Sequence, residues 1–547
     1  MLYDAVRTHL PEFLEHAHER SGRALPKYVV DEFHRFLACG LLEAGFVRVF
    51  CDACGHDFLV AFSCKRRGFC ASCSTRRMTG TAALIVDRVI PDVPVRQWVL
   101  TVPHSLRMLL AQKPAVLTAV HRILVTEIER AYLATTATDA RDAERHPGSV
   151  TFVQRFSGSL GLHVHFHLVA ADGVFVRDTA DSAVRFVAAP PPTPAVLADV
   201  VRRVHTRVIR WLRRRRLLVE TPVEERSNEL PDEDPLTSCL RAATAQGTFG
   251  TMLDPSGAVP VARGADPGEA HFAPPRGSRW VARQDGFNLH AGVTVEQGHR
   301  VGLERLCRYG ARPGLALDRL SRLPDGRYAY RMKYPVNGHT HRFLTPMELM
   351  ARLAGIVPPP RYPLVRYAGV FAPASPWRAL VTPPHPAERR CCALHERERQ
   401  LELAQRRAAL APPATAPTAP VPPSSNSDRE RAVPVPSADI HLASTTTPAS
   451  PDSPAHLAIA PAFPTAGAAT TATRIDWASL LRHGLEIDAL KCRCGARMRI
   501  LAAVTQPAQV QRILAHLREP TGQRIPTRAW DPVPFDPADV PPDEWTA

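Results

Sequence analysis

The apolar positions along the chain follow a helical period in some segments and a strand period in others. Residues 1–48 carry apolar side chains at helical spacing, among them Leu10, Phe13 and Leu14. Residues 96–104 (RQWVLTVPH) are predicted to form a strand. Residues 105–136 are predicted to form a helix interrupted near Pro114, because proline cannot continue the helical hydrogen-bond ladder.

The centre of the chain contains the clearest strand pattern. Apolar and polar residues alternate on both sides of a Gly-Ser turn in residues 149–176 (SVTFVQRFSGSLGLHVHFHLVAADGVFV), which predicts a β-hairpin. A helix is predicted over residues 196–220, a strand over 286–295 and a short helix over 300–310, with Gly310 in the position that follows a helix end. Because strands and helices mix without strict alternation, the pattern predicts an α+β domain.

A change of composition divides the chain. Residues 408–473 consist mainly of Pro, Ala, Ser and Thr. This segment contains too few large apolar side chains to offset the entropy lost on folding, so it is predicted to be a disordered linker. We therefore expect five parts. They are an amino-terminal helical and cysteine-rich module (1–95), a central α+β domain (96–380), a charged helical segment (381–407), the linker (408–473) and a small carboxyl-terminal segment (474–547).

Composition and charge narrow the kind of protein. The chain has 547 residues, 45% of them apolar, and a formal net charge of +15, so we expect more than one domain and an anionic partner, with nucleic acid as the first candidate. No run of eighteen apolar residues predicts a membrane span, and the amino terminus lacks a signal-peptide pattern, so a cytoplasmic protein is expected. In that compartment the twelve cysteines are expected to be metal ligands or reduced thiols.

Two pairs of cysteines predict a zinc site. Cys51 and Cys54 form one C-x2-C pair, Cys70 and Cys73 form another, and fifteen residues separate the pairs, which is the spacing of a zinc ribbon. Four thiolates complete a tetrahedral site, so Cys64 between the pairs is expected to be a packing residue. Basic residues around the pairs are candidates for contacts with DNA phosphates, or alternatively form a solvated surface: Lys65, Arg66, Arg67, Arg76 and Arg77.

Three histidines alternate with apolar residues in the second strand of the predicted hairpin. Residues two apart in a strand point to one face, so His163, His165 and His167 form one row, with neighbours about 6.6–7 Å apart. One neighbouring pair can bind a single ion, but spacing does not choose between the first and the second pair. In a basic, nucleic-acid-binding enzyme, a cation held by two imidazoles would polarise a phosphodiester for attack by water or by a side chain.

Several separate blocks of sequence resemble one family. His165-Phe166-His167 is similar to the His-hydrophobic-His motif of HUH endonucleases. The blocks FVQRFSGSLGLHVHFHLVAADGVF, GFNLHAGV, ERLCRYGARPGLAL, TPMELMARLAGIVPPPRYPLVRYAGVFAP and SCKRRGFCASC resemble the rolling-circle transposases of the insertion-sequence-ninety-one family, as does WASLLRHGLEIDALKCRCGARMRILAAVTQPAQVQRILAHL near the carboxyl terminus. The resemblance spans roughly residues 20–380 and 475–520. It implies an HUH catalytic core, an antiparallel sheet with flanking helices, in residues 96–380.

The resemblance also implies a mechanism. In the family a divalent cation, Mg²⁺ or Mn²⁺, is held by two histidines and a further polar ligand, and a tyrosine attacks the polarised phosphate to leave a 5′-phosphotyrosine. No nucleotide cofactor is needed, because the covalent link conserves the bond energy. Tyr309 in RYGARP matches the family's nucleophile, and Tyr367 is the second candidate. Some members carry another tyrosine four residues earlier, where this chain has Arg305, so it resembles the single-tyrosine variant.

Three further groups of residues are candidates for binding metal or DNA or for reduced thiols. Gln154 is the preferred third ligand of the catalytic cation, with His163 and His290 as alternatives. The run of arginines at the end of the predicted helix over 196–220 is a candidate DNA-phosphate clamp of low sequence specificity, or a solvated face: Arg213, Arg214, Arg215 and Arg216. Cys492 and Cys494 supply half a zinc site at most and are expected to be reduced surface thiols.

Together these features predict a DNA transposase that nicks and transfers single-stranded DNA, with a structural Zn²⁺, in the cytoplasm at the nucleoid. Two alternatives stay open. One is a rolling-circle replication initiator or relaxase-like nickase, although no G-x-x-x-x-G-K-[ST] loop is present. The other is a non-catalytic, zinc-dependent DNA-binding protein descended from a transposase.

Overall fold

The computed structural model describes residues 1–136, 143–179, 182–218, 234–244, 278–336, 339–382 and 491–517. All of these residues belong to one compact unit. The predicted linker (408–473), Cys391 and Cys392, and nearly all of the predicted charged segment (381–407) lie outside the described residues.

A six-stranded antiparallel sheet is the centre of the unit, with strand order β14-β5-β6-β3-β10-β9. These strands come from four separate regions of the chain: β3 (Val95–Thr101), β5 (Gly148–Phe156), β6 (Leu162–Ala171), β9 (Val281–Gln284), β10 (Phe287–Val295) and β14 (Val365–Gly369). β5 and β6 are the predicted hairpin, and every residue of both strands is buried. A sheet with two inner strands buried along their whole length must be covered on both faces.

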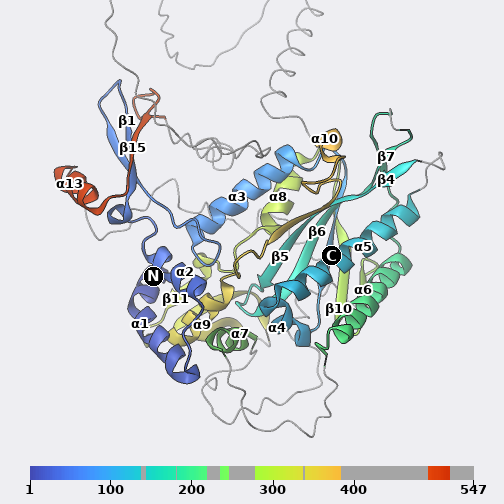
Figure 1. Ribbon diagram of the computed structural model, residues 1–547, viewed down its shortest axis with the longest axis horizontal. Coiled ribbons are helices and arrows are strands. Elements are labelled where there is room, and N and C mark those ends of the chain that lie inside the picture. The colour runs from blue at the N-terminus through green and yellow to red at the C-terminus, as the bar shows by residue number, and fades with distance from the viewer. Residues whose placement is uncertain are drawn as a thin grey trace, which may run out of the picture. The chain divides into compact units, whose positions relative to one another are not determined.

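Helices cover the two faces of this sheet and form separate apolar cores (Figure 1). On one face, α4 (His104–Gln112), α5 (Pro114–Thr135) and α6 (Pro194–Arg214) pack against side chains such as Phe166. On the other face, α3 (Ala71–Arg88) and α8 (Arg300–Gly310) pack against side chains such as Phe152. The histidine row of β6 lies on the second face, because His167 is in register with Phe152 of β5.

The remaining elements surround this layer. The helices are α1 (Leu2–Ser21), α2 (Lys27–Leu37), α7 (Pro235–Thr244), α9 (Pro346–Ile356), α10 (Arg378–Val381), α13 (Pro507–Leu517) and the short η1 (Leu42–Ala44) and η3 (Leu317–Arg319). Three-stranded sheets are formed by β15 (Arg499–Val504), β1 (Phe46–Phe50) and β2 (Asp57–Ala61); by β11 (Leu320–Arg322), β12 (Tyr328–Val336) and β13 (His339–Leu344); and by β4 (Glu144–His146), β7 (Gly173–Arg177) and β8 (Arg185–Ala188).

The α+β prediction is confirmed, and so are the hairpin, the strands at 96–104 and 286–295, and the helix break at Pro114. Two details are wrong. Gly310 is the last residue of α8 rather than the residue after it, and its glycine is needed because a Cβ there would lie 2.5 Å from the Phe152 ring. The arginine run does not continue as helix, since α6 ends at Arg214 and Arg216 has a φ of 54°.

None of the described helices alone is long and apolar enough to cross a membrane. One bent pair, α4 with α5, passes the same test of length and composition when taken together.

Candidate active site and zinc centres

The three histidines of β6 form a buried row on the face of the sheet that α8 covers. The ring centroids of His163 and His165 lie 4.8 Å apart, and those of His165 and His167 lie 4.9 Å apart. The prediction that they share one face is confirmed. Burial lowers the pKa of His165 to about 4 and holds the pKa values of His163 and His167 well below 6.5. All three rings are therefore neutral near pH 7, as metal coordination requires.

Hydrogen bonds assign the protons of two of these rings. His165 Nδ1 lies 2.8 Å from the carbonyl oxygen of His163, which can only accept, so His165 Nδ1 donates its proton and Nε2 carries a lone pair. His163 Nδ1 lies 3.1 Å from the same His165 nitrogen and is therefore an acceptor, which places the proton of the neutral His163 ring on Nε2. His165 presents a coordinating Nε2, whereas His163 in this tautomer does not.

Gln97 of β3 lies beside the third histidine. Its carboxamide nitrogen is 3.1 Å from His167 Nδ1, and rotation of the amide by half a turn places the oxygen there instead. With the oxygen facing Nδ1, His167 donates to Gln97 and presents the lone pair of Nε2. Within the described residues, His167 Nε2 is buried and makes no hydrogen bond. A metal-binding histidine usually donates its other ring N–H to an oxygen acceptor, and the Gln97 amide oxygen can fill that place.

Gln154 of β5 joins the histidine row to the end of α8. It is in register with His165 on the adjacent strand, and its Nε2 donates to the carbonyl oxygens of Tyr309 at 2.9 Å and Gly310 at 3.0 Å. These two acceptors fix the orientation of the amide, since the opposite orientation would set oxygen against oxygen. Its Oε1 is buried and makes no hydrogen bond among the described residues.

These atoms fit the divalent cation that the resemblance implies. His165 Nε2, His167 Nε2 and Gln154 Oε1 are neutral nitrogen and oxygen donors on neighbouring strands, and two of the three are buried without a hydrogen bond. His290 also faces this side but belongs to β10, two strands from β6, which is about 10 Å at the usual strand spacing. Its distance makes His290 the weaker third ligand.

Tyr309, at the end of α8, lies against the histidine row. Its ring centroid is 5.5 Å from that of His167, with the rings almost perpendicular. Arg312 Cζ lies 4.5 Å and Lys333 Nζ 5.6 Å from the centre of the tyrosine ring. Burial by itself would raise the pKa of Tyr309, but Arg312 and Lys333 outweigh it and lower the pKa below 10. Tyr367 differs, because burial raises its pKa.

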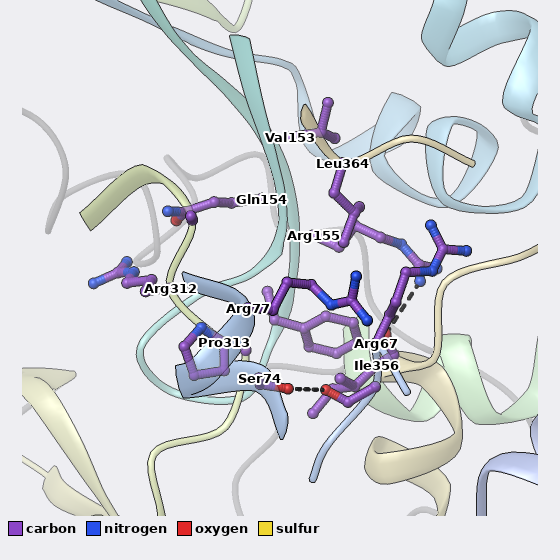
Figure 2. Close-up of a pocket in the computed structure, with 14 residues that line it drawn as sticks. Arg67, Ser74, Arg77, Val153, Gln154, Arg155, Arg312, Pro313, Ile356 and Leu364 are labelled. Carbon is purple, nitrogen blue, oxygen red and sulfur yellow. Dashed lines mark hydrogen bonds between the residues drawn. The ribbon is translucent and has the colours of Figure 1, made fainter. Parts of the chain in front are cut away.

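An open pocket leads from this site toward the cysteine-rich module. Four arginines contribute to its wall, and Figure 2 shows them around Gln154 and Pro313: Arg67, Arg77, Arg155 and Arg312. A second pocket shares Arg67 and Arg77 with the first and adds Lys65 and Arg66. Positive charge thus extends from the cysteine-rich module to the residue next to the Tyr309 helix. Such a basic surface attracts a phosphate backbone.

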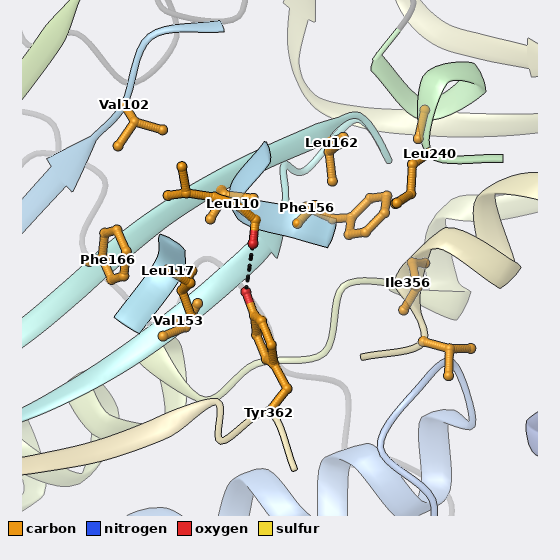
Figure 3. Packing of buried hydrophobic residues seen from close by; sticks show 14 of the residues in the cluster. Val102, Leu110, Leu117, Val153, Phe156, Leu162, Phe166, Leu240, Ile356 and Tyr362 are labelled. Atoms are coloured by element: carbon orange, nitrogen blue, oxygen red, sulfur yellow. Dashed lines mark hydrogen bonds between the residues drawn. The ribbon is translucent and has the colours of Figure 1, made fainter. Parts of the chain in front are cut away.

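The opposite face of β6 is a closed apolar core that supports the histidine row from behind. Val153 and Phe166 pack there with Leu110 and Leu117, and the Tyr362 hydroxyl donates to the carbonyl oxygen of Leu110 at 3.4 Å (Figure 3). Close packing of this kind restricts rotamers and keeps the strand from shifting. The polar face is therefore presented by a rigid strand.

The predicted pairing of the cysteines is wrong. The structure separates Cys51 and Cys54 from Cys70 and Cys73 and places each pair in a different cluster of four: Cys39, Cys64, Cys70 and Cys73; and Cys51, Cys54, Cys492 and Cys494. In the first cluster Cys64 is a member rather than a packing residue. Cys39 was missed because it stands alone in a helical stretch of sequence, with no partner two or three residues away.

The first cluster has the geometry of a tetrahedral zinc site. Its sulfur–sulfur distances include 3.8 Å between Cys39 and Cys73, 3.3 Å between Cys64 and Cys73, and 3.7 Å between Cys39 and Cys70. A tetrahedron with Zn–S bonds of about 2.3 Å has edges of about 3.8 Å. The backbone N–H of Cys64 also donates to Cys39 Sγ at 3.2 Å, and such donation stabilises a thiolate.

The candidate DNA-contact residues fall into two separated groups. Lys65 and Arg77 are exposed beside the pockets, whereas Arg67 is held by the carbonyl oxygens of Tyr362 at 2.7 Å and Pro359 at 2.9 Å. Arg66 and Arg76 are half-buried. The exposed run Arg213–Arg216 begins in the last turn of α6 and continues past its end, and α6 packs on the other face of the sheet from Tyr309.

Two family models match the chain. The family described as "Transposase zinc-binding domain" matches residues 5–102, and the family described as "Putative transposase" matches residues 148–378. No curated protein and no solved structure matches. The two matched ranges contain the first cysteine cluster and the residues around the histidine row, respectively.

The two matches identify a transposase, an enzyme that processes DNA. The chain belongs to the insertion-sequence-ninety-one (IS91) family of transposases. Its resident metal is a structural Zn²⁺ in the amino-terminal domain.

Proposed function

We propose that this transposase cleaves single-stranded DNA with Tyr309 as the nucleophile and transfers the strand in rolling-circle transposition. The Tyr309 oxygen forms a bond to the scissile phosphorus, and the bond from phosphorus to the 3′ oxygen breaks. The phenol loses its proton and the leaving 3′ oxygen gains one, so the products are a 5′-phosphotyrosine and a 3′-hydroxyl. A second 3′-hydroxyl reverses the step and completes strand transfer.

The observation that carries this proposal is the contact between Tyr309 and the histidine row. The centroid of the Tyr309 ring lies 5.5 Å from that of the His167 ring. Gln154, on the strand beside the histidine row, donates a hydrogen bond to the Tyr309 carbonyl oxygen. A nucleophile and the groups that orient its target must be held within about 3–3.5 Å of a shared substrate atom. Tyr309 contacts His167 and has a lowered pKa, whereas burial raises the pKa of Tyr367, and both differences favour Tyr309.

The proposed residues for the catalytic cation are His165, His167 and Gln154. Mg²⁺ or Mn²⁺ bound there would polarise the scissile phosphate and neutralise charge that develops during displacement. The proton on His165 Nδ1 is held by the His163 carbonyl, which keeps the His165 Nε2 lone pair available. His163 then acts as a positioning residue, which gives the third histidine of the row a role.

Basic residues around Tyr309 have two further roles in the proposal, which are to activate the nucleophile and to bind the DNA strand. Arg312 and Lys333 favour the phenolate of Tyr309, the form that attacks. Lys65, Arg66 and Arg77 border the pockets, where they would bind phosphates of the strand, while Arg67 lines the wall of both pockets. The position one helical turn before Tyr309 is Arg305, which cannot act as a tyrosine nucleophile, so Tyr309 alone carries out cleavage and transfer.

A nicking assay tests the proposal. The full chain is incubated with labelled single-stranded DNA carrying transposon-end sequences and Mn²⁺ or Mg²⁺, and covalent adducts are resolved by denaturing electrophoresis. We expect an adduct with the natural protein and with Tyr367→Phe, and none with Tyr309→Phe. DNA binding without any adduct in the natural protein would instead support a zinc-dependent DNA-binding protein, and an adduct in Tyr309→Phe would exclude Tyr309.

A further inference from the structure

The second cysteine cluster joins residues from the two ends of the chain. Cys51 Sγ lies 3.6 Å from Cys494 Sγ, and Cys54 Sγ lies 3.5 Å from Cys492 Sγ. All four sulfur atoms lie within 4.8 Å of one another. Disulfide bonds would require sulfur–sulfur distances near 2.05 Å, whereas a zinc tetrahedron has edges of about 3.8 Å. The spacing therefore matches four thiolates around one ion.

The two halves of the cluster are built in the same way. The N–H of Cys51 donates to the His56 carbonyl at 2.9 Å, and the N–H of Gly55 donates back to the Cys51 carbonyl at 2.9 Å. In the other half, the N–H of Cys492 donates to the Ala496 carbonyl at 2.8 Å, and the N–H of Gly495 donates to the Cys492 carbonyl at 2.9 Å.

In each half the glycine follows the last cysteine and has a positive φ, +67° for Gly55 and +89° for Gly495. Left-handed backbone of this kind is accessible to glycine at little cost. Two tight turns of matching design, facing each other through their sulfur atoms, make up the two knuckles of a zinc ribbon.

A composite sheet and two small apolar cores surround the site. β15 of the carboxyl-terminal segment pairs antiparallel with β1, from Phe46 with Val504 to Phe50 with Arg499. Val49 and Met498 pack beside Cys51 and Cys492, and α13 adds Val510 and Leu514 to a second core with Phe46. Arg499 also pairs with Asp52 at 2.7 Å. These cores are small, so they need further stabilisation.

We propose that Cys51, Cys54, Cys492 and Cys494 bind a second structural Zn²⁺ and that this ion fastens the carboxyl-terminal segment to the amino-terminal module. Cys492 and Cys494 lie outside both matched family ranges. The ion closes the chain into a loop that contains the whole catalytic sheet. Each of the two distant segments supplies two of the four thiolates. Loss of the ion is therefore expected to release residues 491–517 from β1.

Zinc stoichiometry tests the site without DNA, so its outcome is independent of the proposed cleavage. The purified full chain is expected to contain two zinc ions per chain, and the Cys492→Ser/Cys494→Ser variant one. Cys391→Ser/Cys392→Ser is the matched control, since it also removes two cysteines and is expected to keep two ions. A single ion in the natural protein, or two ions in the Cys492/Cys494 variant, would overturn the proposal.

A cleavable chain provides a second measurement that does not depend on a cysteine variant. A protease recognition sequence is inserted near residue 440, and the cut protein is passed over a size-exclusion column. We expect the carboxyl-terminal fragment to elute with the rest of the chain, and to elute separately after a chelator has removed both zinc ions. If the fragment separated before chelation, or still co-eluted after the zinc had been removed, the proposed second zinc site would be contradicted.

Discussion

Two cations determine the chemistry available to Tyr309. Arg312 and Lys333 approach the ring from outside the helix, and their charge lowers the pKa of the phenol although burial opposes this. The cations stabilise the charged phenolate more than the neutral phenol, so removing one of them raises the pKa of Tyr309. Arg312 is also part of the pocket wall and is therefore available to a DNA phosphate.

Replacement of Arg312 should change the pH dependence of cleavage. Activity that requires the phenolate rises with pH until the tyrosine is deprotonated. In Arg312→Gln the rising limb should move to higher pH, because the stabilising charge is gone. Single-turnover adduct formation between pH 6 and pH 10 measures the shift.

Arg305→Gln is the matched control, since Arg305 lies on the same helix but is exposed. It should leave the pH profile where it is. If both variants moved the profile equally, net charge rather than the position of Arg312 would be responsible. If neither did, a cation beside Tyr309 would have no part in its activation.

For single residues, the sequence predicted which side chains form the candidate site better than it predicted their hydrogen-bond partners. The alternation of His163, His165 and His167 was sufficient to place them on one face. It could not assign the tautomers, which depend on the His163 carbonyl and on Gln97, a residue 70 positions from His167 in the sequence. No local pattern signals such a contact, because the register between β3 and β6 creates it.

The helix α8 is positioned by one very close contact with the sheet. Gly310 faces the Phe152 ring so closely that an added Cβ would lie 2.5 Å from it. This approach brings the Tyr309 and Gly310 carbonyls within reach of Gln154. Through this packing, Gly310 positions the end of α8 and Tyr309 beside Gln154.

A methyl group at this position should push the helix end away from the strand. Gly310→Ala is expected to lose about 1–3 kcal/mol of unfolding free energy through overpacking, and to lose most adduct formation because Tyr309 moves with the helix. Urea unfolding and the nicking assay measure the two effects. Gly302→Ala is the control, since its Cβ would meet only the exposed His299 ring, which can turn away.

In Gly302→Ala we expect unchanged activity and equal or slightly higher stability, as alanine favours a helix over glycine. A Gly310→Ala protein as active and stable as the natural one would show that the close contact does not position Tyr309. Sequence reasoning placed this helix but not this contact. The glycine was interpreted as a helix terminator, since only the packed structure reveals the neighbouring ring.

At the scale of the whole molecule, the first cysteine cluster and the proposed active site are joined by one helix. Cys70 precedes α3 and Cys73 lies in its first turn, while the other end of α3 packs under α8. Arg300 at the start of α8 donates to the Pro91 carbonyl at 3.0 Å and the Ile90 carbonyl at 3.0 Å. The zinc module thus supports the helix that carries Tyr309.

Contacts between residues far apart in the chain could not be predicted from the sequence. The family resemblance, the α+β class and the main hairpin all followed from local patterns. The cysteine partners did not, because equal C-x2-C spacing within residues 51–73 suggested a single site. The ligands instead divide between two sites, one of which joins cysteines 438 or more residues apart.

The identity of the tyrosine bound to DNA is the most direct test of the account. The full chain is allowed to form adducts with a single-stranded oligonucleotide, digested with trypsin and analysed by mass spectrometry. Trypsin does not cleave before Pro313, so Tyr309 begins the peptide YGARPGLALDR and Tyr367 begins YAGVFAPASPWR. We predict the nucleotide on the first peptide. A nucleotide on the second peptide, or on any other tyrosine, would contradict the proposed active site.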